Sequence, residues 1–224
     1  SSGFDSGDEV TCTVTPYDGD AVGTALSDSV TIQNTPPELS DLSLSPTTVY
    51  TNDTITATVS SDDDDGDTVS LSYAWYVDGS LVAETGSTLS GATYFDKDAA
   101  VYVEVTPNDG TEDGETLTSD TLAVSNTLPE ALTVTLTPTT AYTNDTLTAT
   151  VTTEDDDDDS VSLSYAWYVD DELLSETGAT LDGEDWFDKD QEVYVVVTPN
   201  DGDEDGDELE SDTTTIDNST PTID

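Results

Sequence analysis

The ten-residue segment VSLSYAWYVD at 69–78 decides the fold of this chain, and the same ten residues return at 161–170. In both copies an apolar or aromatic side chain stands at every second position, so an extended strand would have one apolar and one largely polar face. Segments 54–60 and 100–106 alternate in the same way. No segment carries a helical apolar stripe or approaches the roughly 18 apolar residues of a membrane span. The sequence therefore predicts an all-β protein.

The chain is internally repeated. Residues 37–126 align with 129–218 at a constant offset of 92 positions without a gap, and most aligned positions are identical. We expect residues 35–126 and 127–218 to be two complete repeats arranged head to tail. Residues 219–224 would begin a following repeat, because Pro221 stands in the place of Pro37 and Pro129.

Residues 1–34 correspond to the C-terminal part of a repeat. Phe4 and the Val-Thr-Pro at 14–16 align with Phe95 and the Val-Thr-Pro at 105–107. Two interpretations stay open: the natural polypeptide is longer and contains the rest of this repeat, or another copy completes it by strand donation. Cys12 aligns with Val103, so we expect a small buried apolar side chain there and not a reactive thiol.

Within one repeat, short alternating segments separated by turn residues predict about seven strands. Asp78-Gly79 is a tight-turn signal between two of them. Seven short strands in about 92 residues are typical of an immunoglobulin-like (Ig-like) β-sandwich, whose third strand often buries a tryptophan, here Trp75 and Trp167. Ala57 and Val103 occupy the positions of the disulfide found in many such domains.

The charge of the chain excludes several functions. Its 224 residues include 52 Asp or Glu, two basic residues (Lys97 and Lys189) and no His, for a formal net charge of −50. Nucleic acids and anionic membrane surfaces are poor partners, because binding either of them needs Lys and Arg. Ser-His-Asp triads, zinc sites built on His or Cys and arginine clamps for phosphate cannot form, because the sequence has no His, no Arg and a single Cys. Paired carboxylates on repeated loop tips offer no cleft for glycoside hydrolysis, so we expect no enzyme.

Several short motifs resemble those of a known class of repeats. They are Asn-Thr-Pro-Pro at 34–37, Asp-Asp-Gly-Asp at 64–67, the Tyr-Ala-Trp segment at 73–79, Phe-Asp-Lys-Asp at 95–98 and Val-Thr-Pro-Asn-Asp-Gly at 105–110. Together they resemble tandem Ig-like, cadherin-like or PKD-like repeats of large prokaryotic cell-surface proteins. The resemblance implies stalks, adhesins, surface layers or filaments. Asp158 replaces Gly66 in the second repeat, so the sequence leaves open whether the two repeats have the same turn at this position.

Clustered carboxylates predict metal sites. In an Ig-like sandwich the loops at 61–68 and 107–116 lie at the same end, and both are acidic. Carboxylates crowded in this way repel one another without a cation, and Ca²⁺ takes six to eight oxygen ligands in flexible geometry. We expect calcium at these loops and at the junctions between repeats. The candidate ligands are Asp63, Asp65, Asp67, Asp109 and Asp113, their equivalents Asp155, Asp157, Asp159, Asp201 and Asp205, Asp96 and Asp98 at the opposite end, and Asn126 and Glu130 in the linker.

The acidity has two alternative interpretations, and both stay open. The runs of Asp can be solvated loop tips, which is the usual role of charge runs. They can also be an adaptation to strong salt, which screens repulsion between carboxylates. Separately, Asn52, Asn144 and Asn218 begin N-x-Thr sequons and are candidate glycosylation sites of an exported protein.

These observations predict a structural segment of an extracellular rod, stalk or filament, stiffened by calcium. The expected partners are neighbouring repeats or other copies of the chain. An adhesin whose loop tips contact a surface or a glycan is the alternative.

Overall fold

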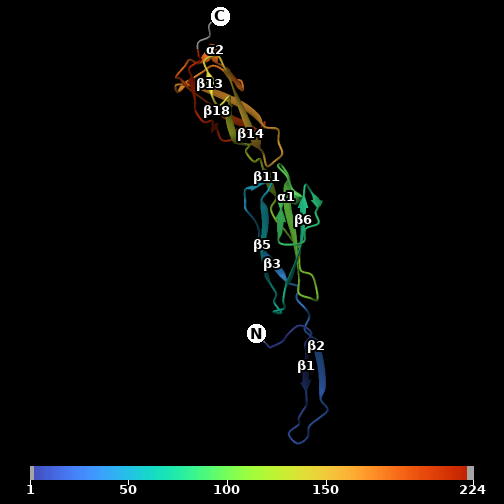
Figure 1. The fold of residues 1–224 in the computed structure, drawn as a ribbon. Helices are drawn as coiled ribbons and strands as arrows, with labels where there is room; N and C mark the ends of the chain where they lie inside the picture. Colours follow the sequence, from blue (N-terminus) through green and yellow to red (C-terminus); the bar gives the residue numbers. More distant parts are fainter. Residues whose placement is uncertain (1–2, 221–224) are drawn as a thin grey trace. The chain divides into compact units, whose positions relative to one another are not determined.

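The computed structural model describes residues 3–220, and their regular secondary structure consists almost entirely of strands (Figure 1). The chain contains tandem Ig-like β-sandwiches, so the predicted all-β fold class is confirmed. Its described residues divide into two units, residues 3–49 with 53–124 and residues 50–52 with 125–220. Of the predicted following repeat at 219–224, residues 221–224 lie outside the described part. No helix among the described residues is long and apolar enough to cross a membrane.

The first sandwich packs a three-stranded sheet against a larger one. The smaller sheet has the order β3 (Glu38–Ser45), β5 (Thr54–Asp62), β8 (Thr88–Ser90). The larger has the order β4 (Val49–Tyr50), β11 (Leu122–Ser125), β9 (Ala100–Asn108), β6 (Ser70–Val77), β7 (Ser80–Leu81), with β10 (Leu117–Thr118) also paired to β9. A four-residue helix, α1 (Gly91–Tyr94), follows β8.

The second sandwich repeats this order. Its smaller sheet is β12 (Glu130–Thr137), β14 (Thr146–Glu154), β17 (Thr180–Asp182). Its larger sheet is β13 (Ala141–Tyr142), β20 (Thr214–Asp217), β18 (Glu192–Asn200), β15 (Ser162–Val169), β16 (Glu172–Leu173), with β19 (Leu209–Glu210) paired to β18. The helix α2 (Gly183–Trp186) follows β17.

Each core is built around the predicted tryptophan. Trp75 and Trp167 are fully buried. Each indole Nε1 donates a 2.8 Å hydrogen bond to a backbone carbonyl, that of Gly86 and Gly178 respectively, so burial leaves no indole donor unpaired. Around them pack the alternate side chains that the period-two pattern placed inward, including Ala57 and Val103.

Two features of the sheets were not predicted. The short strands β4 and β13 are only two residues long, too short for an alternation to show, and β13 pairs in parallel with β20. Residues 117–125 also form two short strands, β10 and β11, and not one continuous strand. Ser119 interrupts the segment, because its N–H donates to the Val103 carbonyl and its Oγ accepts from the Val103 N–H.

Positive backbone φ angles show which turns the two repeats share. Asp78-Gly79 and its counterpart Asp170-Asp171 all have positive φ, between 48° and 73°, as a two-residue hairpin turn requires. Gly66 and Asp158 also share the left-handed region, at 81° and 60°. The turn between β5 and β6 therefore shares this backbone conformation with the turn between β14 and β15. Asp tolerates this conformation better than most residues.

Residues 3–34 form a two-stranded hairpin, β1 (Glu9–Val14) and β2 (Leu26–Thr31), and β1 pairs with no other described strand. The prediction that Cys12 is buried is wrong, because its side chain is exposed. Its equivalents Val103 and Val195 are fully buried by strands that have no counterpart in this hairpin.

Candidate metal centre

In each repeat, the linker that precedes the sandwich donates hydrogen bonds to both of its acidic loops. Ahead of the second sandwich, Asn126 Nδ2 donates to Asp201 Oδ2 at 2.8 Å, and the Thr127 N–H donates to Asp157 Oδ2 at 2.6 Å. Ahead of the first sandwich, Asn34 Nδ2 donates to Asp109 Oδ2 at 2.8 Å and the Thr35 N–H to Asp65 Oδ2 at 2.7 Å. The two acidic loops of a sandwich thus lie at the same end.

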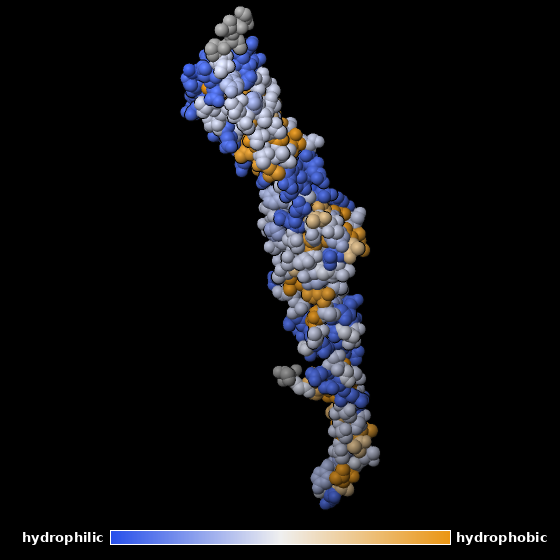
Figure 2. All heavy atoms as spheres, viewed as in Figure 1, coloured by the Kyte–Doolittle hydropathy of each residue, from blue (hydrophilic) through white to orange (hydrophobic). Residues whose placement is uncertain are grey.

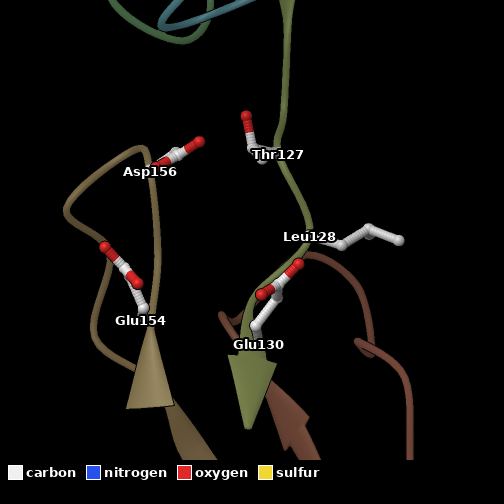
Figure 3. Close-up of a pocket in the computed structure, with 5 residues that line it drawn as sticks. All are labelled: Thr127, Leu128, Glu130, Glu154 and Asp156. Atoms are coloured by element: carbon white, nitrogen blue, oxygen red, sulfur yellow. The ribbon is translucent and has the colours of Figure 1, made fainter. Parts of the chain in front are cut away.

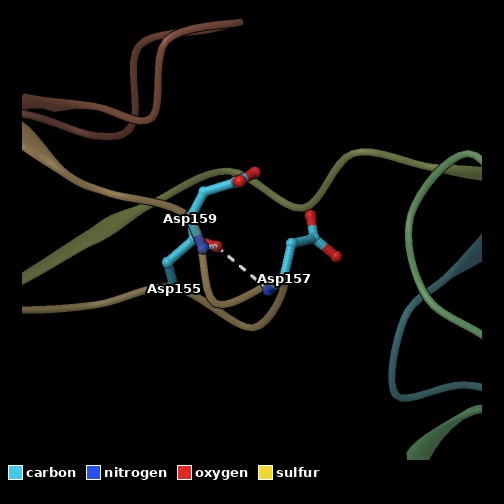
Figure 4. Close-up of side chains that lie close together, drawn as sticks. All are labelled: Asp155, Asp157 and Asp159. Carbon is cyan, nitrogen blue, oxygen red and sulfur yellow. Dashed lines mark hydrogen bonds between the residues drawn. The ribbon is translucent and has the colours of Figure 1, made fainter.

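The loop between β14 and β15 folds three aspartates around one carboxylate. Asp155 Oδ1 accepts hydrogen bonds from the N–H groups of Asp157 and Asp159, at 2.9 and 3.1 Å (Figure 4). The loop between β5 and β6 repeats this pattern, with Asp63 Oδ1 accepting from Asp65 and Asp67 at 3.0 Å each. Alternate aspartates on a tight turn therefore meet without any pairing from another strand.

Asp155, Asp157 and Asp159 form the cluster with metal-binding geometry. One carboxylate oxygen from each lies within 4.8 Å of the other two, and all three residues are partly buried. Calcium binds oxygens at about 2.3–2.6 Å, so two ligands of one ion are separated by at most about 5 Å. The spacing of these oxygens fits a shared ion.

Four oxygens at these loops and linkers are buried and accept no hydrogen bond from residues 3–220. They are Asp63 Oδ2, Asp155 Oδ2, Asn126 Oδ1 and Thr127 Oγ1. Asn126 and Thr127 are the residues whose N–H groups bind the acidic loops, so their orphaned oxygens belong to the same region of the second sandwich. A buried carboxylate oxygen without a donor is costly unless a cation lies against it.

Within its own sandwich, each lysine is distant in the fold from the acidic loops. Lys189 pairs with the neighbouring Asp190 at 3.4 Å. Lys189 precedes β18 and Asp201 follows β18. The nine residues of this strand span roughly 30 Å. Lys97 precedes the equivalent strand β9. Each lysine therefore lies at the opposite end of its own sandwich from that sandwich's acidic loops.

The other predicted ligands have different surroundings. Asp113 and Asp205 accept hydrogen bonds from the amides of Asn108 and Asn200, at 2.7 and 2.8 Å, and close their own loops. Asp96 and Asp98 precede β9, a strand length away from Asp109. Within a sandwich they cannot share an ion with the acidic loops.

Glu130 contributes to a neighbouring pocket. With Glu154, Asp156, Thr127 and Leu128 it lines a space of about 160 Å³ (Figure 3). Three carboxylates around this pocket add negative potential close to the Asp155 cluster. Thr127 was not among the predicted ligands, although the repeated Asn-Thr at 34–35 and 126–127 was a signal for it.

The pKa of Asp109 lies below the ordinary value for an aspartate. The main cause is the hydrogen bond from Asn34, followed by those from the N–H groups of Glu112 and Thr111, all of which favour the charged carboxylate. The ionised group therefore stabilises the first sandwich above about pH 4. This contribution is lost as the pH falls through the lowered, folded-state pKa.

Replacing Asn34 by alanine is expected to raise the pKa of Asp109 toward its ordinary value, because the first cause of the shift is removed. A carboxyl-carbon NMR titration measures this change directly. Asp170 serves as the internal control, since its lowered pKa depends on Glu192 and Gln191 in the other unit. An unchanged Asp109 titration in the variant would contradict the role of the linker amide.

Two glycines permit the linkers to approach the acidic loops. A Cβ atom on Gly206 would lie 1.8 Å from the Pro129 carbonyl oxygen, and one on Gly114 would lie 1.9 Å from that of Pro37. Real Cβ atoms do not approach backbone so closely. Glycine at these positions is therefore required for the linker to pack against the loop that carries Asp201 or Asp109.

Replacing Gly206 by alanine is expected to destabilise the second sandwich by about 1–3 kcal/mol, as overpacking commonly does. Chemical denaturation followed by circular dichroism measures the loss. Gly178→Ala is the matched control, because its Cβ would meet mainly the flexible end of Glu176. Equal stability of the two variants would refute close linker packing at Gly206.

The three sequon asparagines, Asn52, Asn144 and Asn218, are exposed. Asn52 and Asn144 occupy equivalent turns before β5 and β14. A glycan on any of them would not need to displace core side chains, and occupancy stays a prediction.

Comparison with known proteins gives fold-level similarity. No protein-family model matches the chain, and no curated protein matches it. Among solved structures, three N-terminal domains of the bacteriophage RB49 highly immunogenic outer capsid protein are 20% identical, with a TM-score of 0.31 over 78% of this chain and 58% of theirs. Two fibronectin type III domains of chicken tenascin are 10% identical, with a TM-score of 0.42 over 79% of this chain and 98% of theirs.

The N-terminal eight Ig domains of Down syndrome cell adhesion molecule are 13% identical, with a TM-score of 0.41 over 96% of this chain and 28% of theirs. The chain thus spans just over half of the capsid protein fragment and about a quarter of this adhesion-molecule fragment. At such identities and TM-scores the similarity says nothing about function. By strand order and core, each complete repeat of this chain is an immunoglobulin-like β-sandwich.

Proposed function

We propose that this chain is a structural segment of an extracellular rod, stalk or filament, and that calcium bound at its acidic loops holds each linker against the sandwich that follows it. The proposal includes no catalytic role. It takes the chain to be one of the repeat-built prokaryotic surface proteins that its motifs resemble.

One observation carries the calcium part of the proposal. Asp155 Oδ2 is buried and has no hydrogen-bond donor within the described chain, and it belongs to a cluster whose other carboxylates lie within 4.8 Å. The sequence contains no His or Arg, and Lys189 of the same sandwich pairs with Asp190, so a cation from solvent would supply positive charge at this oxygen.

The donor set favours calcium over magnesium. Carboxylates of Asp155, Asp157 and Asp159 would be joined by Asn126 Oδ1 and Thr127 Oγ1, a mixed set of charged and neutral oxygens. Calcium accepts six to eight such ligands in irregular geometry, whereas magnesium demands a near-ideal octahedron and retains its waters. Asp63, Asp65 and Asp67 repeat the hydrogen bonds of this loop in the first sandwich, but their carboxylate oxygens are not gathered within 4.8 Å of one another as those of the Asp155 cluster are, so calcium there stays a prediction.

The proposed mechanical role follows from the fact that the calcium ligands belong to two different segments of the chain. Asn126 and Thr127 belong to the linker, and the aspartates belong to the loop between β14 and β15. One ion bound by both would cross-link linker and loop in addition to the hydrogen bonds already present. Repetition of the same arrangement along a chain is what a stiffened rod requires. The exposed sequons are consistent with an exported protein.

Isothermal titration calorimetry of the chain with Ca²⁺ tests the proposal. We expect binding with a Kd of about 10⁻⁴–10⁻³ M or tighter, the range of extracellular calcium modules, and weaker binding of Mg²⁺. Asp155→Asn is expected to weaken the site in the second sandwich at least about tenfold, since it removes a charge from the centre of the cluster.

Asp212→Asn is the matched control. It removes the same charge from the same unit at an exposed position outside the acidic loops, and calcium affinity should be nearly unchanged. The absence of calcium binding at several millimolar, or equal losses in both variants, would show that the loops are merely solvated.

A further inference from the structure

The N-terminal hairpin has the local structure of the end of a repeat. The N–H of Gly7 donates to the Ile32 carbonyl at 3.0 Å, and the N–H of Ile32 donates to the Asp8 carbonyl at 2.8 Å. The first sandwich has the same two bonds at the corresponding residues. They are Asp98 N–H to the Val124 carbonyl and Val124 N–H to the Ala99 carbonyl, at 3.0 and 2.9 Å.

The turn of this hairpin is also that of a repeat. Asp18 Oδ1 accepts from the N–H groups of Asp20 and Ala21, at 3.0 and 2.8 Å. Asp109 Oδ1 accepts in the same way from Thr111 and Glu112, at 2.7 Å each. The hairpin thus reproduces the turn between β9 and β10.

The strand register agrees as well. Val10 faces Val30 and Val14 faces Leu26. In the first sandwich the corresponding pairs are Val101 with Leu122 and Val105 with Leu117. The hairpin is therefore the equivalent of β9 with β10 and β11, in the same pairing, and its inward face can be assigned from theirs.

That inward face is exposed. Val101, Val103 and Val105 are fully buried in the first sandwich, but Val14 is 64% exposed and Cys12 is exposed. On β2, Leu26 and Val30 are 78% and 62% exposed. Apolar residues of the hairpin are visible on the molecular surface in Figure 2.

One edge of the hairpin is also unpaired. In the complete sandwich β9 pairs with β6 from Val101↔Val77 through Asn108↔Ser70, along its whole length. The corresponding edge of β1 pairs with no strand among residues 3–220. An apolar face beside a free strand edge is a template for strand addition.

We propose that the hairpin of residues 3–34 is a docking surface for a strand set of the same chemistry as residues 35–91. A tryptophan strand like β6 would extend the sheet at the free edge of β1. A sheet like β3–β5–β8 would cover the apolar face, burying Val10, Cys12 and Val14 as Val101, Val103 and Val105 are buried. The result would be a third Ig-like sandwich.

A second copy of this chain is not the proposed occupant. Its tryptophan strands β6 and β15 are already paired on both edges, with β9 and β7 and with β18 and β16. Two hairpins facing one another would bring together no tryptophan, because residues 1–34 contain none. The occupant must supply the strands that the hairpin lacks.

Cys12 reports directly on coverage of this face, since it is the one cysteine of the sequence and is exposed. The experiment measures its alkylation rate in the whole chain, alone and with a separate polypeptide of the sequence of residues 35–91. A parallel version joins that polypeptide to the N-terminus of the chain through a flexible linker. We expect the alkylation rate of Cys12 to fall about tenfold or more in the joined version and in the mixture at saturation. A tenfold fall corresponds to coverage of the hairpin in about nine-tenths of the molecules.

Val14→Asp on the inward face is expected to abolish this protection. Thr13→Asp, the matched change on the outward face, should retain it. Unchanged Cys12 reactivity in both the mixed and the joined version would overturn the proposal. It would also be overturned if Cys12 in the chain alone became protected as the chain concentration rose, because a second copy would then be the occupant.

Discussion

Replacing Trp167 by alanine is expected to destabilise the second sandwich by about 3–5 kcal/mol, the usual cost of deleting a buried aromatic side chain. The indole is fully buried and lies on β15, which is paired on both edges. Its Nε1 also satisfies the Gly178 carbonyl, so the variant creates a cavity and leaves an acceptor without its donor. For a domain whose total stability is commonly 5–15 kcal/mol, this loss approaches unfolding.

Chemical denaturation followed by circular dichroism measures this effect, with the two sandwiches treated as separate transitions. Trp75→Ala should produce an equivalent loss in the first sandwich. Leu173→Ala is the control, because its side chain is 63% exposed and its removal should cost less than about 0.5 kcal/mol. A Trp167 variant as stable as the Leu173 variant would mean that the tryptophan is not the centre of the core.

Calcium is expected to raise the unfolding temperature of the second sandwich. A ligand present at about 100 times its Kd stabilises the folded state by about 2.7 kcal/mol. For a sandwich of this size, this corresponds to a shift of about 10 °C or more. Removing calcium with EGTA should reverse the shift. Asp155→Asn should reduce the shift by about half or more, and Asp212→Asn should leave it in place.

Titration with NaCl separates calcium binding from general screening of charge. At 1 M salt the Debye length is about 3 Å, so repulsion between carboxylates is largely removed without any specific site. If NaCl alone reproduced the full shift and calcium added nothing at moderate salt, the acidity would serve tolerance of salt and the site would be refuted. A shift that begins at millimolar calcium, at constant ionic strength, and grows with the logarithm of the calcium concentration supports the site.

The alternation of side chains around Trp75 and its repetition 92 residues later were sufficient to predict the sandwiches. A strand paired within a sheet buries every second side chain, and this requirement is written directly in the sequence. The short strands β4 and β13 were not predictable, because a two-residue strand has no period. Their position depends on pairing with a distant strand.

The candidate site was predicted in part. Alternate aspartates on a loop indicated the Asp155 cluster, because the turn that gathers them is local. Asn126 was predicted as a ligand and Thr127 was not, and the burial of their side-chain oxygens was not predictable from the sequence. Their burial results from packing of the linker against the loop near Gly206, which depends on the whole sandwich.

Cys12 likewise shows the difference between what the local sequence predicts and what tertiary packing decides. Sequence alignment placed it at a core position, and the backbone of the hairpin agrees with that alignment. Burial, however, depends on strands far away in sequence or on another polypeptide.

The sequence by itself determined the all-β class, the repeats, the tryptophan cores and the location of the negative charge, because strand periodicity and tight turns are local properties of a chain. Only the tertiary structure decided which carboxylates lie close together, which oxygens are left without donors and which apolar face is left uncovered. Those properties depend on distances between segments far apart in sequence, and these distances are set by packing.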